Sequence, residues 1–442
     1  MTRFLVTCWP LPGHVHPQLA VAEALRERGH DVAFYTGERA RETVEGAGFK
    51  VFGFRAVDEA RILEAIFAVE RRPRRPDPRL VRRAFRTWLV DSVSDQIEDL
   101  DRVVPDWRPD AVVCDLAMWA PIVVLGERDG LPVALSSTFM GPLIPGPQAP
   151  PWGFGLKPPR TAARRLAYAA LNRVVEALGR PLRRELDAIR ARHGLPPMGR
   201  SINAYTAHLP LQLVGNVREL DYDRTDLPPS VHYVGPLAWH PHDEPQAGDW
   251  IDKLPARRPW VHVTESTIAG ADAFLLEAAA RGLAGAPVEA ILTTGGHRDP
   301  AALGLADPAP NVHVTDWVSH SALLPRCSAV VTNGGAGTVI AALRAGVPLV
   351  IVPTTWDKPD NARRVTEAGA GIRLPARRCS PERLRAAVME VLDNPRYARA
   401  ARRIADVLAG APGPAGAAAL LEALDSARGR KARRARTREG VR

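Results

Sequence analysis

Two residues in the first third of the chain, His14 and Asp115, could together take a proton from a substrate. An apolar run, residues 4–8, is followed by Gly13-His14 and then by a helical pattern from Gln18 to Arg28. A helix N-terminus carries partial positive charge, which disfavours an imidazolium and favours a neutral His14 that can accept a proton. A histidine at a turn also serves purely structural roles, and the residues alone leave both interpretations open.

A carboxylate beside such a histidine would hold its tautomer and stabilise the cation that forms when it takes a proton. Asp115 is the candidate, because it ends the apolar run Ala111 to Cys114. Aspartate is also a common N-cap, so Asp115 could instead cap a helix that begins near Ala117.

A glycine-rich junction in the second half is suited to binding an anion. It reads Asn333-Gly334-Gly335-Ala336-Gly337-Thr338, after an apolar strand pattern and before a helical pattern. Glycines let backbone amides approach a phosphate, and a helix N-terminus adds unpaired N–H donors. A tight-packing turn is the alternative. The junction has neither the G-x-G-x-x-G spacing of dinucleotide-binding proteins nor the Lys-Ser/Thr of a P-loop.

Two neighbouring segments offer groups of other kinds, an aromatic ring and a cluster of polar side chains. Trp317 follows a strand pattern, where its ring could stack on a base, although core packing is an equally ordinary role for tryptophan. The run from Thr354 to Asn361 places polar side chains after another apolar strand pattern. Such a polar cluster is suited to reading sugar hydroxyls.

All of these residues belong to two series of alternating strand and helix patterns. Strand patterns occur at residues 4–8, 32–35 and 51–54, and again at 260–264, 290–294, 312–315, 329–332 and 349–352. This alternation predicts α/β domains with parallel sheets, which bind ligands at the carboxyl ends of their strands.

The proline content divides the chain into domains. We expect a first domain over residues 1–220, a proline-rich linker over 221–258 and a second domain over 259–425. Residues 426–442 read as a basic, disordered tail.

The net charge of +10 is concentrated at the end of the chain. Residues 428–442 hold eight basic side chains and one acid, so the remainder carries only +3 and does not indicate a nucleic-acid partner. No apolar run reaches the length of a membrane span, and no signal-peptide layout precedes the first strand pattern. The four cysteines are scattered without C-x-x-C pairing. We therefore expect a cytoplasmic protein.

The order of the motifs resembles the family-one glycosyltransferases, inverting nucleotide-sugar enzymes that include plant UDP-glycosyltransferases and bacterial antibiotic and macrolide glycosyltransferases. Their donor signature, W-x-P-x…LL…T-H-G-G-x-G-T…A-L-x-x-G-V-P-L…D-Q-x-x-N-A, is followed in order from Trp317 to Ala362. Gly13-His14-x-x-Pro17 is similar to the family's N-terminal signature, and Pro109 to Asp115 is similar to its P-D-x-x-x-x-D. The resemblance extends to about Leu424. It implies the GT-B fold, two Rossmann-like domains that face each other across a cleft.

The resemblance implies a role for each of these residues. His14, oriented by Asp115, would deprotonate an acceptor in the first domain, and inversion would need neither a metal nor a cofactor beyond the nucleotide-sugar co-substrate. The donor-binding positions in the second domain are Thr267, Trp317, His320, Asn333, Gly334, Gly335, Gly337, Thr338, Asp357 and Lys358. Trp317 would stack on the base, Thr267 and the glycine loop would hold the diphosphate, and Asp357 with Lys358 would face the sugar.

Four departures from the family pattern bear on the donor. Asn333 replaces the family's histidine and can donate a hydrogen bond but carries no charge. Lys358 replaces a glutamine and could reach the diphosphate or an acidic sugar group, and Ser266 replaces a glycine in the phosphate turn. The plant-type ribose-binding glutamate is Ala341, which makes a thymidine-diphosphate deoxysugar as plausible as UDP-glucose.

We therefore expect an inverting glycosyltransferase that moves a sugar from a dTDP- or UDP-linked donor to a hydroxyl or amine of a bulky natural product. Residues 58–90 and 139–160 mix aromatics, prolines and arginines and are expected to line the acceptor pocket. The main alternative is a catalytically weak nucleotide-sugar-binding homologue that acts as a partner protein, which the change to Asn333 suggests. A GT-B-like epimerase or hydrolase would lack the His14–Asp115 pair, and a nicotinamide oxidoreductase would need the missing dinucleotide fingerprint.

Overall fold

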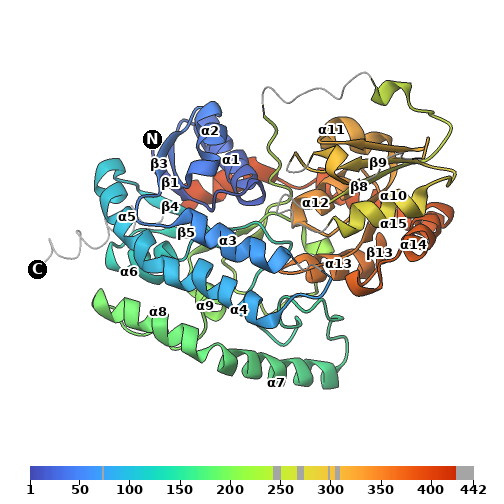
Figure 1. Ribbon diagram of the computed structural model, residues 1–442. Coiled ribbons are helices and arrows are strands. Elements are labelled where there is room, and N and C mark those ends of the chain that lie inside the picture. The colour runs from blue at the N-terminus through green and yellow to red at the C-terminus, as the bar shows by residue number, and fades with distance from the viewer. Residues whose placement is uncertain (72–73, 242–249, 266–272, 297–298, 304–308, 425–442) are drawn as a thin grey trace, which may run out of the picture.

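The protein folds into two parallel-sheet α/β units (Figure 1). The computed structural model describes residues 1–71, 74–241, 250–265, 273–296, 299–303 and 309–424. The first sheet has seven strands in the order β3-β2-β1-β4-β5-β6-β7, and the second has six in the order β10-β9-β8-β11-β12-β13. Every pair of neighbouring strands is parallel. The predicted fold class is confirmed.

Strands and helices alternate along the chain. The strands are β1 (Arg3–Thr7), β2 (Asp31–Thr36), β3 (Lys50–Gly53), β4 (Ala111–Asp115), β5 (Val133–Ser137), β6 (Leu211–Val214), β7 (Val231–Tyr233), β8 (Trp260–Thr264), β9 (Glu289–Thr293), β10 (Val312–Thr315), β11 (Cys327–Thr332), β12 (Leu349–Ile351) and β13 (Gly371–Arg373). The α-helices of the first unit are α1 (Pro12–Glu27), α2 (Glu38–Gly46), α3 (Glu59–Glu70), α4 (Pro78–Arg86), α5 (Ser92–Trp107), α6 (Gly126–Arg128), α7 (Ala162–Leu178), α8 (Arg180–Arg192) and α9 (Ile202–Tyr205). Those of the second are α10 (Phe274–Leu283), α11 (His320–Leu323), α12 (Ala336–Arg344), α13 (Lys358–Glu367), α14 (Pro381–Asp393) and α15 (Pro395–Ala409), and two π-helical turns, η1 (Thr87–Asp91) and η2 (Pro121–Leu125), lie in the first unit.

The central strands are apolar along their whole length because helices cover both faces of each sheet. All five residues of β4 and all five of β8 are buried. Separate apolar clusters fill the two faces of the first sheet and the two faces of the second. This layering fixes the strand ends, and therefore the loops after them, as rigid positions for a site.

Each sheet reverses its strand order at one point, where loops at the carboxyl ends diverge and open a crevice. In the first sheet the reversal lies between β1 and β4, and in the second it lies between β8 and β11. His14 follows β1 and Asp115 ends β4, while the glycine-rich junction follows β11. His14, Asp115 and the glycine-rich junction thus lie at the reversal points, whereas Trp317 follows β10 and Asp357 follows β12.

Helix α1 begins at Pro12, earlier than the Gln18 expected from the sequence. Proline suits the first turn because its missing N–H would have no partner there. The helix continues past Pro17 and ends at Glu27, with Arg28 as the C-cap residue before Gly29, whose φ is 84°. His14 consequently lies inside the first turn of the helix.

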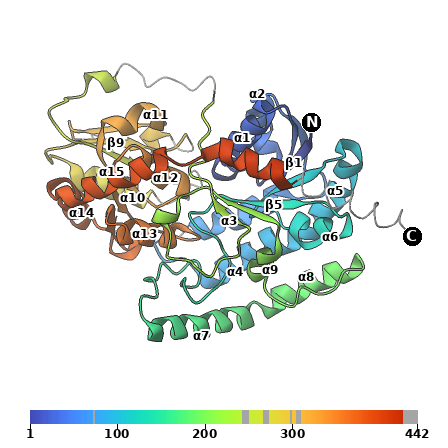
Figure 2. The same cartoon turned by 180° about the vertical axis from the view of Figure 1, so that it is seen from behind.

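The chain crosses between the two units twice. Strand β7 (Val231–Tyr233) lies within the segment expected as a linker and pairs with β6, so the first sheet reaches beyond residue 220. The last described helix, Gly413–Leu424, returns to the first unit, as the view from behind shows (Figure 2). Its residues Ala417, Ala418 and Leu421 are buried in the apolar cluster beside α1. This helix follows the second unit in the chain, but it forms part of the core of the first unit.

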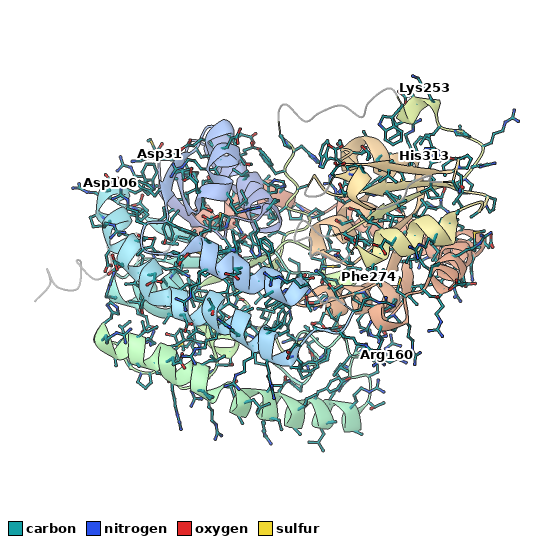
Figure 3. The ribbon with its side chains drawn as sticks, viewed as in Figure 1. Asp31, Asp106, Arg160, Lys253, Phe274 and His313 are labelled. Atoms are coloured by element: carbon teal, nitrogen blue, oxygen red, sulfur yellow. The ribbon has the colours of Figure 1, made fainter. Side chains whose placement is uncertain are left out.

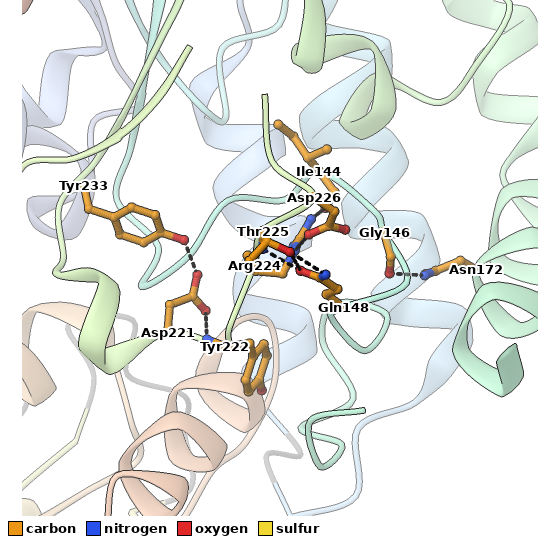
Figure 4. A network of polar contacts seen from close by, with 10 residues as sticks. All are labelled: Ile144, Gly146, Gln148, Asn172, Asp221, Tyr222, Arg224, Thr225, Asp226 and Tyr233. Atoms are coloured by element: carbon orange, nitrogen blue, oxygen red, sulfur yellow. Dashed lines mark hydrogen bonds and ion pairs between the residues drawn. The ribbon is translucent and has the colours of Figure 1, made fainter. Parts of the chain in front are cut away.

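A polar network anchors the start of the crossing segment (Figure 4). The Tyr233 hydroxyl donates to Oδ2 of Asp221 at 2.6 Å. Arg224 is buried and donates to Oδ1 of Asp226 at 2.6 Å and to the carbonyl of Ile144 at 2.9 Å. This part of the expected linker is therefore bound to the loop after β5.

Within the described part of the chain, no single helix has the length and apolar character needed to cross a membrane. One bent pair, Pro395–Ala409 with Gly413–Leu424, meets the criterion by length and composition across a 41° bend.

Candidate active site

His14 and Asp115 are joined directly at the carboxyl edge of the first sheet. Nδ1 of His14 lies 2.7 Å from Oδ2 of Asp115, and the Asp115 side chain is completely buried. The backbone N–H groups of Trp9 and Ala117 each donate to this carboxylate at 3.2 Å. Asp115 thus both orients His14 and makes the cap-like contact to Ala117 that was its alternative role. Nδ1 is engaged, which leaves Nε2 as the ring nitrogen available to another molecule.

The pKa of His14 lies above its ordinary value of 6.5. Burial lowers this pKa, but the charge of Asp115, its hydrogen bond and the charge of Asp357 together outweigh burial. The direction is opposite to the one expected from the helix end alone, because a paired carboxylate acts more strongly than the partial charges of a helix N-terminus. Because Asp357 belongs to the second domain, charges from both domains raise the pKa of His14.

Two tryptophans connect His14 to the second domain. The Trp88 ring, in the π-helical turn η1, meets the His14 ring edge-on with centroids 5.8 Å apart. Trp356 meets Trp88 at 5.8 Å and 87°. Trp356 has a φ of 59°, a left-handed conformation that is rare for a bulky residue and concentrates at functional sites. The indole N–H groups of Trp88 and Trp356 are buried without a hydrogen-bond partner among the described residues.

The glycine-rich junction after β11 forms the opening turn of α12. Gly335 is the N-cap residue and no side chain caps the helix, so its first N–H groups are open to an anion. Gly337 is exposed and Thr338 half-buried on this turn. The junction therefore has the geometry of an anion-binding helix start.

Gly334 has a φ of 94°, and a Cβ there would lie 2.8 Å from Cγ2 of Ile351 and 3.3 Å from the carbonyl oxygen of Lys358. We expect Gly334→Ala to lower the free energy of unfolding by roughly 1–3 kcal/mol, because it combines left-handed strain with a steric clash. Gly335→Ala is the matched control, since Gly335 has a φ of −57° and a Cβ added there would meet no atom within 4 Å. Urea denaturation measures both, and equal stability of the two variants would contradict this account.

The other donor-site residues lie around this turn. Trp317 is 40% exposed, so its ring has a free face. His320 begins α11 and its ring packs edge-on against His262, with centroids 5.5 Å apart. Asn333 is buried, and its Oδ1 has no hydrogen-bond partner among the described residues. Thr267 lies outside the described residues.

Helix α13 begins against the glycine turn and presents Asp357 at its N-terminus. Nδ2 of Asn361 donates to Oδ2 of Asp357 at 2.7 Å and to the Gly334 carbonyl at 2.9 Å, so one amide ties the two segments together. Burial raises the pKa of Asp357, against the opposing effects of Asn361 and Lys358. In the described part of the chain no three His, Cys, Asp or Glu side chains gather as a metal site.

Lys358 differs from its expected placement. Its Nζ lies 3.3 Å from Oε1 of Glu70 at the end of α3 and donates to Oγ1 of Thr354 at 3.0 Å. Both charged side chains are 4% exposed. The sequence leaves open that Lys358 reaches the diphosphate or an acidic sugar group; in the structure its ammonium group contacts the carboxylate of Glu70 in the opposite domain.

Further contacts hold the two domains together on the same side. The amides of Gly153 and Gly155, in the loop after β5, each donate to the Asp360 carboxylate at 2.7 Å. At the molecular edge, Arg160 forms an exposed ion pair with Glu367 at 2.7 Å; Figure 3 labels Arg160. Helix α13 thus contacts the first domain near its N-terminus, through Asp360, and at its last residue, Glu367.

Glu70, Trp88 and Trp356 have no assigned role in the sequence interpretation. Glu70 and Trp88 fall inside residues 58–90, the stretch expected to line the acceptor pocket, but nothing in that stretch singles them out. Trp356 directly precedes Asp357, and this position next to a predicted site residue is the sequence feature that could have identified it. Its left-handed φ and its contact with Trp88 depend on the tertiary fold.

Known proteins share this chain's sequence over most of its length. Residues 288–424 match the family model of the erythromycin biosynthesis protein CIII-like C-terminal domain. The 4'-demethylrebeccamycin synthase of Lentzea aerocolonigenes is 35% identical over 96% of this chain and 99% of its own length. The elloramycin glycosyltransferase of Streptomyces olivaceus is 30% identical over 95% and 96%.

Solved structures share the fold. The glycotransferase of kitacinnamycin superposes with a TM-score of 0.73 at 23% identity, covering 96% of this chain and 99% of the other. A spinosyn rhamnosyltransferase complexed with thymidine diphosphate has a TM-score of 0.67 at 23% identity, covering 96% and 100%. The relatives align with nearly the whole chain, and the solved structures have the same fold over the same range. The chain belongs to the family-one glycosyltransferases of GT-B fold.

Proposed function

We propose that this glycosyltransferase moves a sugar, with inversion, from a thymidine-diphosphate sugar to a hydroxyl or amine of a bulky aromatic natural product. The observation that carries the proposal is the His14–Asp115 pair at 2.7 Å, which faces the charge of Asp357 from the other domain. A base and a sugar-facing carboxylate on opposite sides of one site are what such a transfer requires.

In the proposed mechanism, His14 acts through Nε2. Asp115 accepts a hydrogen bond from the Nδ1–H group, which keeps the Nε2 lone pair directed away from the carboxylate. As the acceptor oxygen or nitrogen bonds to the anomeric carbon, its proton passes to Nε2. The resulting imidazolium is stabilised by the buried charge of Asp115. Attack from the face opposite the leaving group inverts the anomeric carbon.

The leaving nucleoside diphosphate takes the electron pair of the broken carbon–oxygen bond. The open N–H groups at the start of α12 are suited to this developing negative charge. Asn333, at the position of the family's histidine, has a side-chain NH₂ group that would donate a neutral hydrogen bond to the diphosphate.

Thymidine diphosphate is the favoured nucleotide for two reasons. Ala341 provides no polar group at the position where plant-type relatives bind a ribose hydroxyl, so a deoxyribose loses nothing there. A spinosyn rhamnosyltransferase and a second glycosyltransferase of similar fold are described as complexes with thymidine diphosphate.

The aromatic acceptor is supported by the walls next to His14. Trp88 contacts the His14 ring and Trp356 contacts Trp88, so aromatic rings extend from the base toward the second domain. Trp152 stacks on Phe139 in the loop expected to line the pocket, with centroids 5.5 Å apart. The relatives named for rebeccamycin and elloramycin synthesis support a natural product as acceptor.

A thermal-shift panel with dTDP, UDP, GDP, ADP and NAD tests the donor site without an acceptor. At a hundredfold excess over its dissociation constant, a ligand stabilises the folded state by about 2.7 kcal/mol. We expect dTDP to raise the melting temperature most. A shift with NAD and none with either pyrimidine diphosphate would contradict the proposal.

Trp317→Ala probes the nucleotide base directly. Loss of the exposed ring is expected to weaken dTDP binding by about 1–3 kcal/mol, or roughly 5- to 150-fold in Kd, because base stacking on an aromatic ring has about this strength. Isothermal titration calorimetry measures the change. Leu166→Ala is the control, since Leu166 on α7 is 73% exposed and belongs to the other domain. Equal dTDP affinity in both variants would exclude Trp317 from the nucleotide site.

A further inference from the structure

A buried ion pair joins the two domains beside the donor site. Oε1 of Glu70, the last residue of α3, accepts hydrogen bonds from Nζ of Lys358 at 3.3 Å and from the hydroxyl of Thr355. Lys358 also donates to Thr354 at 3.0 Å. One carboxylate of the first domain therefore holds several polar groups in the segment that leads into α13.

The pair is almost removed from water, since each side chain is 4% exposed. Removing one partner of a buried ion pair leaves an unpaired charge and costs several kcal/mol, whereas replacing both partners by neutral groups of similar size is often nearly neutral. Glu70 therefore neutralises Lys358 at the position next to Asp357. An ammonium group held in this way is not free to recognise an acidic sugar.

The held segment is continuous with the donor-binding groups. Asn361, one turn after Lys358, donates both to Asp357 at 2.7 Å and to the carbonyl of Gly334 at 2.9 Å. The backbone of Lys358 also packs against Gly334, where a Cβ would lie 3.3 Å from the Lys358 carbonyl oxygen. A shift of the Lys358 segment would therefore move Asp357 and the glycine turn with it.

We propose that Glu70 is a positioning and specificity-determining residue for the donor, acting from the opposite domain through Lys358. It sets the place of Asp357 and the glycine turn, and it cancels the Lys358 charge so that the site takes an uncharged sugar. This proposal rests on the proposed function. It gives Glu70, a residue of the first domain, a role in donor recognition without direct contact with the donor.

A double-mutant cycle tests the proposal with Glu70→Gln, Lys358→Gln and the double variant. Glu70→Gln leaves an unpaired ammonium and is expected to tighten dTDP binding, whereas Lys358→Gln leaves an unpaired carboxylate and is expected to weaken it. Each single variant should lower kcat/KM for the donor by about tenfold or more, and the double variant should recover to within roughly threefold of wild type. Calorimetry gives the Kd of dTDP, and initial rates give kcat and KM separately.

Opposite changes in Kd distinguish this role from a general loss of structure, which would weaken binding in both single variants. The exposed interdomain pair Arg160–Glu367 provides the matched control cycle, with Arg160→Gln and Glu367→Gln expected to leave the Kd of dTDP unchanged. If Glu70→Gln does not fold while the double variant folds and is active, the charge coupling is upheld by that contrast.

Three results would overturn the proposal. These are independent effects of the two substitutions in the double variant, changes of Kd in the same direction in both single variants, or an equally large coupling in the Arg160–Glu367 cycle. Wild-type protein that binds neither dTDP nor UDP would instead contradict the proposed function itself. The wild-type titration therefore separates failure of the donor assignment from failure of the Glu70 assignment.

Discussion

His14→Ala is expected to lower kcat by roughly 10²- to 10⁴-fold, the range that a positioned general base contributes. The imidazole is held at 2.7 Å by a buried carboxylate. Donor binding should be unchanged, because the nucleotide-binding groups lie on the other sheet. Initial-rate kinetics with saturating donor and acceptor measure the loss, and calorimetry with dTDP confirms that the donor site is intact.

His16→Ala is the matched control for this substitution. His16 lies on the same helix two residues later, but its ring packs against Trp239 with centroids 5.1 Å apart. We expect His16→Ala to keep kcat within about threefold of wild type, as for a residue away from the reacting atoms. A large loss in His16→Ala with little change in His14→Ala would contradict the assignment of His14 as the base.

The architecture could be predicted because its signals are local. Apolar runs alternating with helical patterns identify buried parallel strands whatever lies far away in the chain. His14 and Asp115 are 101 positions apart, yet they follow β1 and end β4, strands that the sheet order makes neighbours. The pairing is predicted from the family resemblance. The residues alone also allow a structural histidine at a turn and an aspartate that caps a helix.

The remaining features depend on contacts between domains, which no local pattern encodes. Lys358 follows the family's sugar-facing aspartate in sequence, but its ammonium group is turned toward Glu70, 288 positions away. The pKa of His14 is raised by charges from β4 and from the second domain, which a helix-end argument does not include. Likewise, β7 reads as part of a proline-rich linker because three residues are too short for strand periodicity.

Asp115→Asn is expected to lower kcat by roughly 10²- to 10⁴-fold and to move the acidic limb of the kcat/KM profile to lower pH. In the wild-type enzyme, rates should fall as pH drops below the raised pKa of His14, because the base must be unprotonated. Asparagine removes the Asp115 charge, so burial then dominates and lowers the pKa of His14. The base would stay deprotonated to lower pH but would be a weaker proton acceptor.

Hydrogen bonding at Asp115 explains why an isosteric amide cannot replace it. The carboxylate accepts from Trp9, Ala117 and His14 through its two oxygens, whereas asparagine has one oxygen and one NH₂ group. If the NH₂ group faces His14, Nδ1 must accept and Nε2 carries the proton, which is the wrong tautomer for a base. If it faces Ala117, two N–H groups oppose each other at a buried site. A pH profile of kcat/KM for both enzymes decides the matter: an acidic limb that stays in place in Asp115→Asn would mean that another group is the base.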